Sequence, residues 1–193
     1  MRIRSILLSA AFVLLAASPA LAQKKFENDG NHTFFRFKAS TSLFDVEGWF
    51  DKYNLDIKGD PADPKDAQIK IELDTASINT RNKTRDKHLQ SPDFFDAKKN
   101  KKITFISSKV TKEGEKYMVT GTLDMHGVKK EITIPFNHTR AKNGAGYDED
   151  VFKGSLTINR KDYGIGVDSV AAKLSLADEV ELRILIAGFV AAK

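Results

Sequence analysis

The sequence of 193 residues contains no cysteine, only five prolines and a single tryptophan. The lack of cysteine excludes disulfide bonds, cysteine nucleophiles and thiolate ligands for zinc. The sequence also lacks a glycine-rich phosphate loop and the GxSxG turn that presents a nucleophilic serine. Stability must therefore come from a packed apolar core, and several classes of enzyme are already disfavoured.

Histidine is sparse as well. His32, His88, His126 and His138 fall on separate predicted elements and lack the spacing of metal ligands. We therefore expect no metal site, no cofactor and no catalytic residue, and we expect the protein not to be an enzyme. A triad of Asp86, His88 and a nearby serine is conceivable, but such coincidences are mostly surface residues.

The only long apolar run lies at the amino terminus. Arg2 and Arg4 precede an apolar stretch over residues 6–17, and Ala20 and Ala22 form a small-residue cleavage site. This pattern predicts a signal peptide over residues 1–22, cleaved after Ala22. The run of about a dozen residues is shorter than the roughly 20 that span a bilayer, so we expect no stable membrane insertion.

Residues 23–193 are predicted to form a single domain, because no linker, repeat or low-complexity segment interrupts them. Without Arg2 and Arg4, this part keeps 29 of the 31 Lys and Arg residues against 26 Asp and Glu. The charges are spread along the sequence and form no basic stripe. We therefore expect no nucleic-acid partner.

Most of the chain alternates between apolar and polar residues with a period of two, as in strands with one buried face. Short turns at Gly59–Pro64, Glu113–Gly114, His126–Gly127 and Asn143–Gly146 separate the segments, which favours antiparallel neighbours. The pattern predicts an all-β protein, an antiparallel barrel of eight or nine strands. Charged residues occupy the alternate positions, so the apolar face is expected to point inward.

The inward positions define a candidate ligand site. A barrel of about eight strands is either filled by its own side chains or holds one small ligand, and both alternatives remain open from periodicity. Gly121 and Gly154 fall at inward positions, which indicates either a bulge or close approach of another group. The residues expected to line an apolar slot are Phe35, Phe37, Phe105, Tyr117, Val119, Leu123, Phe136, Phe152, Leu182 and Ile184.

A polar and basic insert, DTASINTRNKTRDKHLQSPDFFD over residues 74–96, separates two of the predicted strands. It predicts a short α-helical segment near residues 80–96, with Thr80 as N-cap, Pro92 as terminator and Ser91 as the N-cap of a second turn. Arg81, Arg85 and His88 share one face at helical spacing. They are candidates to contact a ligand head group, although a solvated helix face explains them as well.

The strings SINT, RDKHL, SPDFFD, VTGTLDMHGVKKEITI and INRKDYGI, in this order, resemble the YceI-like polyisoprenoid-binding family of bacterial periplasmic proteins. The resemblance implies a lipocalin-like barrel that holds a long isoprenoid or another lipid, and a periplasmic location. Two stretches depart from the family pattern: residues 38–41, where relatives carry a histidine, and Lys101-Lys102, where they carry a proline. The string at 159–164 is a family signature, in which we expect Arg160 and Asp162 to pair structurally.

Two functional hypotheses follow. The first is a periplasmic carrier for a long-chain lipid of the polyprenyl, quinone or fatty amide type. The second is a barrel enzyme that acts on such a lipid, with His88 or Asp86 as acid or base. The oligomeric state is left open, a homodimer included.

Overall fold

The computed structural model describes residues 25–60 and 63–190, and the predicted signal peptide lies outside them. Eleven strands form one sheet, and every pair of neighbours is antiparallel. The strands are β1 (Phe26–Asn28), β2 (Phe34–Thr41), β3 (Asp45–Phe50), β4 (Tyr53–Asp60), β5 (Asp63–Asp74), β6 (Ile78–Asn79), β7 (Lys102–Glu113), β8 (Lys116–Met125), β9 (Val128–Lys142), β10 (Asp148–Asn159) and β11 (Leu176–Val190).

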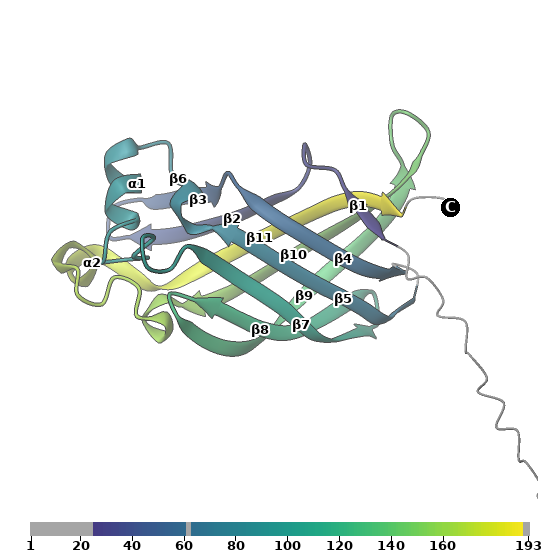
Figure 1. The fold of residues 1–193 in the computed structure, drawn as a ribbon. Coiled ribbons are helices and arrows are strands. Elements are labelled where there is room, and N and C mark those ends of the chain that lie inside the picture. The colour runs from purple at the N-terminus through teal and green to yellow at the C-terminus, as the bar shows by residue number, and fades with distance from the viewer. Residues whose placement is uncertain (1–24, 61–62, 191–193) are drawn as a thin grey trace, which may run out of the picture.

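The sheet curls into an elongated barrel (Figure 1), with the strand order β4-β5-β7-β8-β9-β10-β11-β2-β3-β6. The predicted all-β antiparallel barrel with a helical insert is thereby confirmed. The predicted count of eight or nine strands is slightly low. The two shortest strands, β1 and β6, contain three and two residues, which is too few for an alternation to be recognised.

The amino-terminal strand β1 lies between the two sides of the barrel wall. It pairs with the end of β11, where Phe26 faces Val190, and Lys25 forms a bridge with Lys58 of β4. The Phe26 side chain is buried. Residues just after the predicted cleavage site therefore help to close the barrel.

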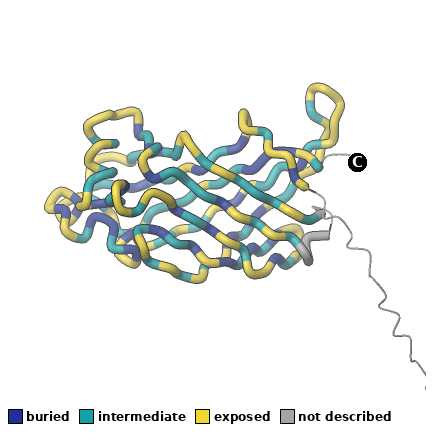
Figure 2. The backbone as a smooth tube through the Cα atoms, viewed as in Figure 1, coloured by how far each residue is buried: buried dark blue, intermediate teal, exposed yellow. Residues whose placement is uncertain are grey.

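The strands bury one face and expose the other, as the sequence predicted. On β2, Phe35 and Ala39 are buried while Arg36 is exposed. Figure 2 shows the same alternation of buried and exposed positions along the barrel wall. A residue and its sequence neighbour therefore lie on opposite sides of the wall, which fixes the lining of the interior.

The two ends of the barrel differ (Figure 1). One end carries α1 (Lys83–Leu89), α2 (Val170–Ser175) and the 3-10 helices η1 (Thr75–Ser77) and η2 (Arg160–Tyr163). We call it the helical end. The other end carries β1 and the 143–147 loop. In residues 25–60 and 63–190, none of the helices combines the length and apolar character needed to cross a bilayer.

The helical insert is shorter than predicted. Asn82, rather than Thr80, is the N-cap of α1, and its side chain accepts hydrogen bonds from the amides of Thr84 and Arg85. The helix ends at Leu89, and residues 91–95 form turns instead of a second helix. Thr80 does not cap the helix because its amide and hydroxyl donate to the Asp86 carboxylate.

Candidate ligand cavity

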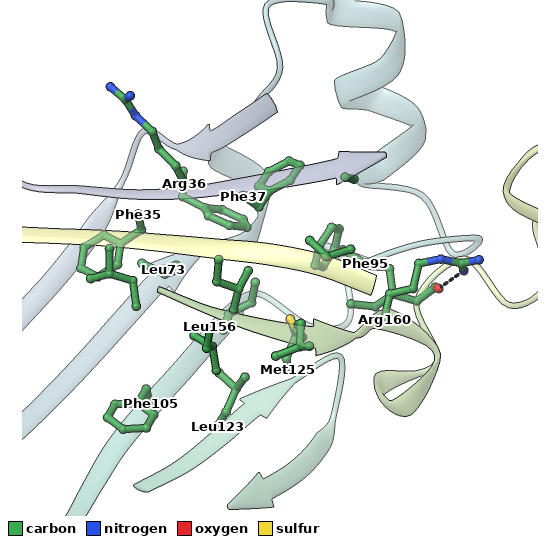
Figure 3. A pocket seen from close by; sticks show the side chains of 18 of the residues that line it. Phe35, Arg36, Phe37, Leu73, Phe95, Phe105, Leu123, Met125, Leu156 and Arg160 are labelled. Carbon is green, nitrogen blue, oxygen red and sulfur yellow. Dashed lines mark hydrogen bonds between the residues drawn. The ribbon is translucent and has the colours of Figure 1, made fainter. Parts of the chain in front are cut away.

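An apolar cavity of about 140 Å³ lies inside the helical end of the barrel. Strands from all around the wall contribute to it, and loops close its end: Leu89 comes from α1, Phe94 and Phe95 from the following turns, and Leu176 from the start of β11. Figure 3 shows side chains from opposite strands converging on this space. The cavity can hold an apolar group and offers almost no polar contacts.

A second apolar cavity of about 60 Å³ follows further along the barrel, toward β1. Phe26, Tyr117 and Phe152 are among its lining residues. Ile71 and Phe105 line both cavities. These two side chains therefore form the partition between the two spaces.

All ten residues predicted to line an apolar slot are found on the cavity walls. The first cavity is lined by Phe35, Phe37, Phe105, Leu123, Leu182 and Ile184. The second is lined by Phe105, Tyr117, Val119, Phe136 and Phe152. Their contact with a ligand stays a prediction.

Sequence reasoning missed the residues that close the first cavity. Phe94 and Phe95 lie in the polar insert, and Ile165 lies in the loop after η2, so no strand periodicity marked them. The Phe95 ring meets the Phe50 ring edge-on, with 6.3 Å between centroids. An adjacent pair of aromatic residues in a polar, helical stretch was the one signal that could have indicated an apolar lid.

The inward glycines are explained by aromatic rings that pack on them. A Cβ atom at Gly121 would lie 2.7 Å from Cζ of Phe105, and one at Gly154 would lie 2.6 Å from Cε1 of Phe136. The strand pairing opposite Gly121 is also irregular between Ser107 and Lys109. Both predicted explanations, a bulge and the close approach of another group, apply at Gly121. The groups that approach Gly121 and Gly154 are aromatic rings of the protein, and these rings occupy space that a ligand could otherwise use.

The Arg160 guanidinium lies at the edge of the first cavity and is buried, with 3% of the residue's surface exposed. It donates to the backbone carbonyls of Ile165, Leu176 and Ala177 and to the carboxylate of Asp178. Figure 3 places it beyond Met125 and Phe95 at the end of the cavity. Its donors are occupied by the chain, so it ties η2 and the loop after it to the start of β11.

The predicted pairing of Arg160 with Asp162 is wrong. Asp162 pairs with Lys130 on β9 instead, at 2.8 Å. Lys161, followed by Arg160, lowers the pKa of Asp178 through hydrogen bonds and charge. Residues 159–164 have a structural role as expected, but the ion-pair partner of Arg160 is Asp178, which follows α2 in the chain.

The three head-group candidates lie at the helical end but are not among the cavity-lining residues. Arg85 donates to the hydroxyl and carbonyl of Thr80, each at 2.8 Å. The Arg81 guanidinium lies 5.2 Å from the centre of the Trp49 ring. Contact with a head group stays a prediction for Arg81, Arg85 and His88, and the Arg85 guanidinium already donates to the loop residue Thr80.

His88 and Asp86, the candidate acid or base, each contact other residues of the insert. The His88 ring packs edge-on against Phe94, with 5.0 Å between centroids, and its Nε2 lies 3.4 Å from Asp93. Asp86 accepts from Thr80. Both groups take part in the geometry of the insert, and neither is among the residues that line a cavity.

An ionic network around the buried Asp150 lies next to the second cavity, and no motif in the sequence indicated it. Asp150 is 1% exposed and accepts two hydrogen bonds from Arg140, at 2.9 and 2.8 Å. Its Oδ1 also lies 2.7 Å from Nε2 of His138. The His138 ring stacks on Phe152, which lines the cavity. The cavity therefore meets a charged cluster at this end.

A separate group of titratable side chains lies near β1. Oxygen or nitrogen atoms of Asp29, His32 and Glu149 all come within 4.8 Å of one another. A hydrogen bond and the negative charge of Asp29 raise the pKa of the His32 imidazole. Glu149 lies on β10, far along the chain from Asp29 and His32, so the spacing of the histidines in the sequence does not indicate this group.

The YceI-like domain family matches residues 26–187 of the chain. A UPF0312 protein of Serratia proteamaculans is 34% identical over 185 residues, with 94% of each chain covered. A UPF0312 protein of Pseudomonas savastanoi is 38% identical over 157 residues, covering 79% of this chain and 81% of the relative.

Solved structures agree with this assignment. The chain resembles BcnA of Burkholderia cenocepacia with a TM-score of 0.75 and 29% identity, covering 84% of this chain and all of the other. A YCEI protein of Campylobacter jejuni matches with a TM-score of 0.66 and 33% identity, over 77% and 86% of the two chains. A polyisoprenoid-binding domain from Saccharophagus degradans, at 18% identity and a TM-score of 0.63 over 86% and 98% of the chains, shares the fold. The family match over nearly all described strands and the barrel geometry lead to one conclusion: the chain belongs to the YceI-like family.

Proposed function

We propose that this protein is a periplasmic carrier that holds a long-chain isoprenoid or related lipid, of the polyprenyl, quinone or fatty amide type, and that it is not an enzyme. The observation that carries the proposal is the apolar cavity at the helical end, lined by strands from around the barrel. The family membership and the polyisoprenoid-binding neighbour support the same ligand class.

The tail of such a ligand would supply most of the affinity. Burial of each methylene group contributes about 0.8 kcal/mol. An exposed ion pair with a head group contributes about 1 kcal/mol or less. Since the cavity wall is apolar almost throughout, we expect tolerance among head groups and selectivity for the shape and length of the tail.

The size of the cavity adds a condition. A dry cavity of about 150 Å³ accommodates a benzene-sized group, whereas sites for larger ligands have volumes of about 300–1,000 Å³. The first cavity, at about 140 Å³, has the volume that suits a benzene-sized group. A long tail therefore requires side chains to rotate, and the partition formed by Ile71 and Phe105 is where rotation would join the two spaces.

The decisive experiment is organic extraction of the purified protein followed by mass spectrometry. We expect one prenyl or acyl lipid per chain. The variant Leu156→Trp, which fills the first cavity from β10, should lose this lipid. Thr157→Trp is its matched control, because the neighbouring residue is exposed on the outer face. Protein that carries no lipid, and takes none up when a prenyl lipid is supplied, contradicts the proposal.

The location can be tested separately. We expect the protein in the periplasmic fraction of a bacterial host, with Gln23 as the first residue of the mature chain. Protein that retains residues 1–22 and stays in the cytoplasmic fraction contradicts export without affecting the lipid-binding part of the proposal.

A further inference from the structure

Four large apolar side chains are exposed at the helical end of the barrel. Leu43 is 88% exposed, Phe44 60%, Val170 70% and Leu174 80%. We call this set the apolar end patch. Single exposed apolar residues are ordinary, but four of them on the β2–β3 turn and the adjoining α2 form a patch of the kind found at interaction sites.

The patch is held together by the backbone. Leu43 and Phe44 form the turn between β2 and β3, and the amide of Ser42 donates to the carbonyl of Ser175 at the end of α2. Val170 and Leu174 are four residues apart on α2 and therefore share one helix face. Leu176, directly after α2, lines the first cavity. The patch therefore adjoins the end of the barrel at which the larger cavity lies.

The same end concentrates positive charge, although the charges look dispersed along the sequence. Residues 75–101 contain seven Lys and Arg against three Asp, and residues 160–175 contain three against two. At the opposite end, residues 25–33, 112–116 and 140–150 together contain five Lys and Arg against seven Asp and Glu. The described part of the barrel thus has one basic end and one acidic end.

Much of this positive charge is available for a partner. Exposed lysines of the helical end with no ion pair within 4 Å in residues 25–60 and 63–190 are Lys83, Lys87, Lys98, Lys99, Lys101 and Lys173. A surface that combines protruding apolar side chains with flexible lysines matches an anionic bilayer, which offers apolar chains beneath a layer of negative head groups.

We propose that the helical end docks reversibly on the surface of an anionic phospholipid bilayer, with the apolar end patch inserted among the head groups and the lysines around it. The docking itself is independent of any cargo. Its value for transfer rests on the proposed function: the docked orientation turns the larger cavity toward the bilayer, so that a lipid tail could pass without crossing water.

The test is co-sedimentation of the purified full-length mature protein with vesicles. We expect binding to vesicles of equal parts phosphatidylcholine and phosphatidylglycerol, little binding to phosphatidylcholine alone, and weakening as salt is raised. The double variant Leu43→Asp with Leu174→Asp should bind at least about tenfold more weakly. Tyr147→Asp is the matched control, because this side chain is 70% exposed at the opposite end.

A second pair of variants tests the charge. Lys98→Glu with Lys99→Glu should weaken binding to phosphatidylglycerol vesicles, whereas Lys112→Glu with Lys116→Glu, the same change of charge at the other end, should not. Binding that ignores lipid charge, or that survives both end-patch substitutions, overturns the proposal. So does a stable wild-type dimer that the end-patch variant dissociates, because the patch would then be covered by a second copy.

The two proposals fail separately. The end-patch double variant should still take up a prenyl lipid supplied in detergent, since no cavity wall is changed. If the wild type binds vesicles but never holds a lipid, the carrier function is wrong and the docking stands. If it holds a lipid but ignores phosphatidylglycerol vesicles, the docking is wrong and the carrier function stands.

Discussion

The ring of Phe105 on β7 occupies the space that a side chain at position 121 on β8 would need. A Cβ atom built at Gly121 would lie 2.7 Å from Cζ of Phe105 and 2.4 Å from the carbonyl oxygen of Ile106. Because Phe105 also separates the two cavities, the absence of a side chain at Gly121 sets the position of the partition.

Gly121→Ala should therefore destabilise the protein. The backbone oxygen cannot move away freely, so we expect a loss of about 1–3 kcal/mol in the free energy of unfolding, measured by denaturant titration. Gly144→Ala is the control, because nothing lies within 4 Å of its added Cβ. Equal stability of the two variants would contradict the close approach.

Removal of the partition should change which lipids are bound. Phe105→Ala joins the two cavities, so we expect longer tails in the extracted lipid, at a cost of about 3–5 kcal/mol in stability. Phe105→Leu keeps most of the volume and should fold even if the alanine variant does not. An unchanged distribution of tail lengths in both variants, measured by mass spectrometry, would show that Phe105 does not limit the site.

Arg160→Met should be among the most damaging substitutions. It leaves the carbonyls of Ile165 and Leu176 without their donor, and we expect a loss of about 3–5 kcal/mol in the free energy of unfolding. Arg160→Lys should restore only part of this, since an ammonium group cannot reach several carbonyls at fixed angles. Arg36→Met, an exposed arginine on β2, provides the control, and a similar loss there would argue against a special role for Arg160.

The pair of Asp29 and His32 should give the protein a pH-dependent contact. The hydrogen bond from the His32 ring lowers the pKa of Asp29, while the same carboxylate raises the pKa of His32. The contribution of this ion pair to folding stability is lost as pH rises through the raised pKa of His32. The same contribution is lost as pH falls through the lowered pKa of Asp29. The ion pair is fully formed at pH values between these two pKa values.

Titration of the His32 ring by NMR measures this effect. In Asp29→Asn the pKa of His32 should fall toward the ordinary value of about 6.5. Glu149→Gln removes a smaller charge effect and should lower the pKa of His32 less. A larger effect from Glu149 than from Asp29 would reverse this assignment.

His88→Ala separates the carrier from the alternative enzyme. The carrier predicts the same lipid occupancy as the wild type, because His88 is not among the cavity-lining residues. An enzyme using His88 predicts that turnover of the bound lipid stops while occupancy is kept. Comparison of extracted lipids with their conversion products in wild type and variant distinguishes these outcomes.

The wall of the barrel was predictable because alternation is a local property. Phe35, Phe37 and Leu182 could each be assigned to the inner face from their immediate neighbours, and all three line the first cavity. The insert was recognisable as helical for the same reason. Its N-cap was predicted wrongly because Thr80 is engaged by Asp86, six residues away, and local preference does not include that bond.

The ends of the barrel could not be predicted because they depend on chain segments that meet only in the fold. Phe95 meets Phe50, and Arg160 meets Asp178, across long stretches of sequence. The difference in net charge between the two ends of the barrel has the same origin. Dispersed lysines of residues 75–101 and 160–175 come together only because every turn at the helical end is built from a different part of the chain.

The pairing of β1 with β11 has a consequence for how the barrel closes. Phe26 and Val190 lie at nearly opposite ends of the described chain, yet they face one another in the ladder and Phe26 lines the second cavity. Closing a contact between such distant residues costs the entropy of a long loop, and the pairing of β1 with β11 must offset that cost. The wall of the second cavity is therefore complete only when both ends of the described chain are in place.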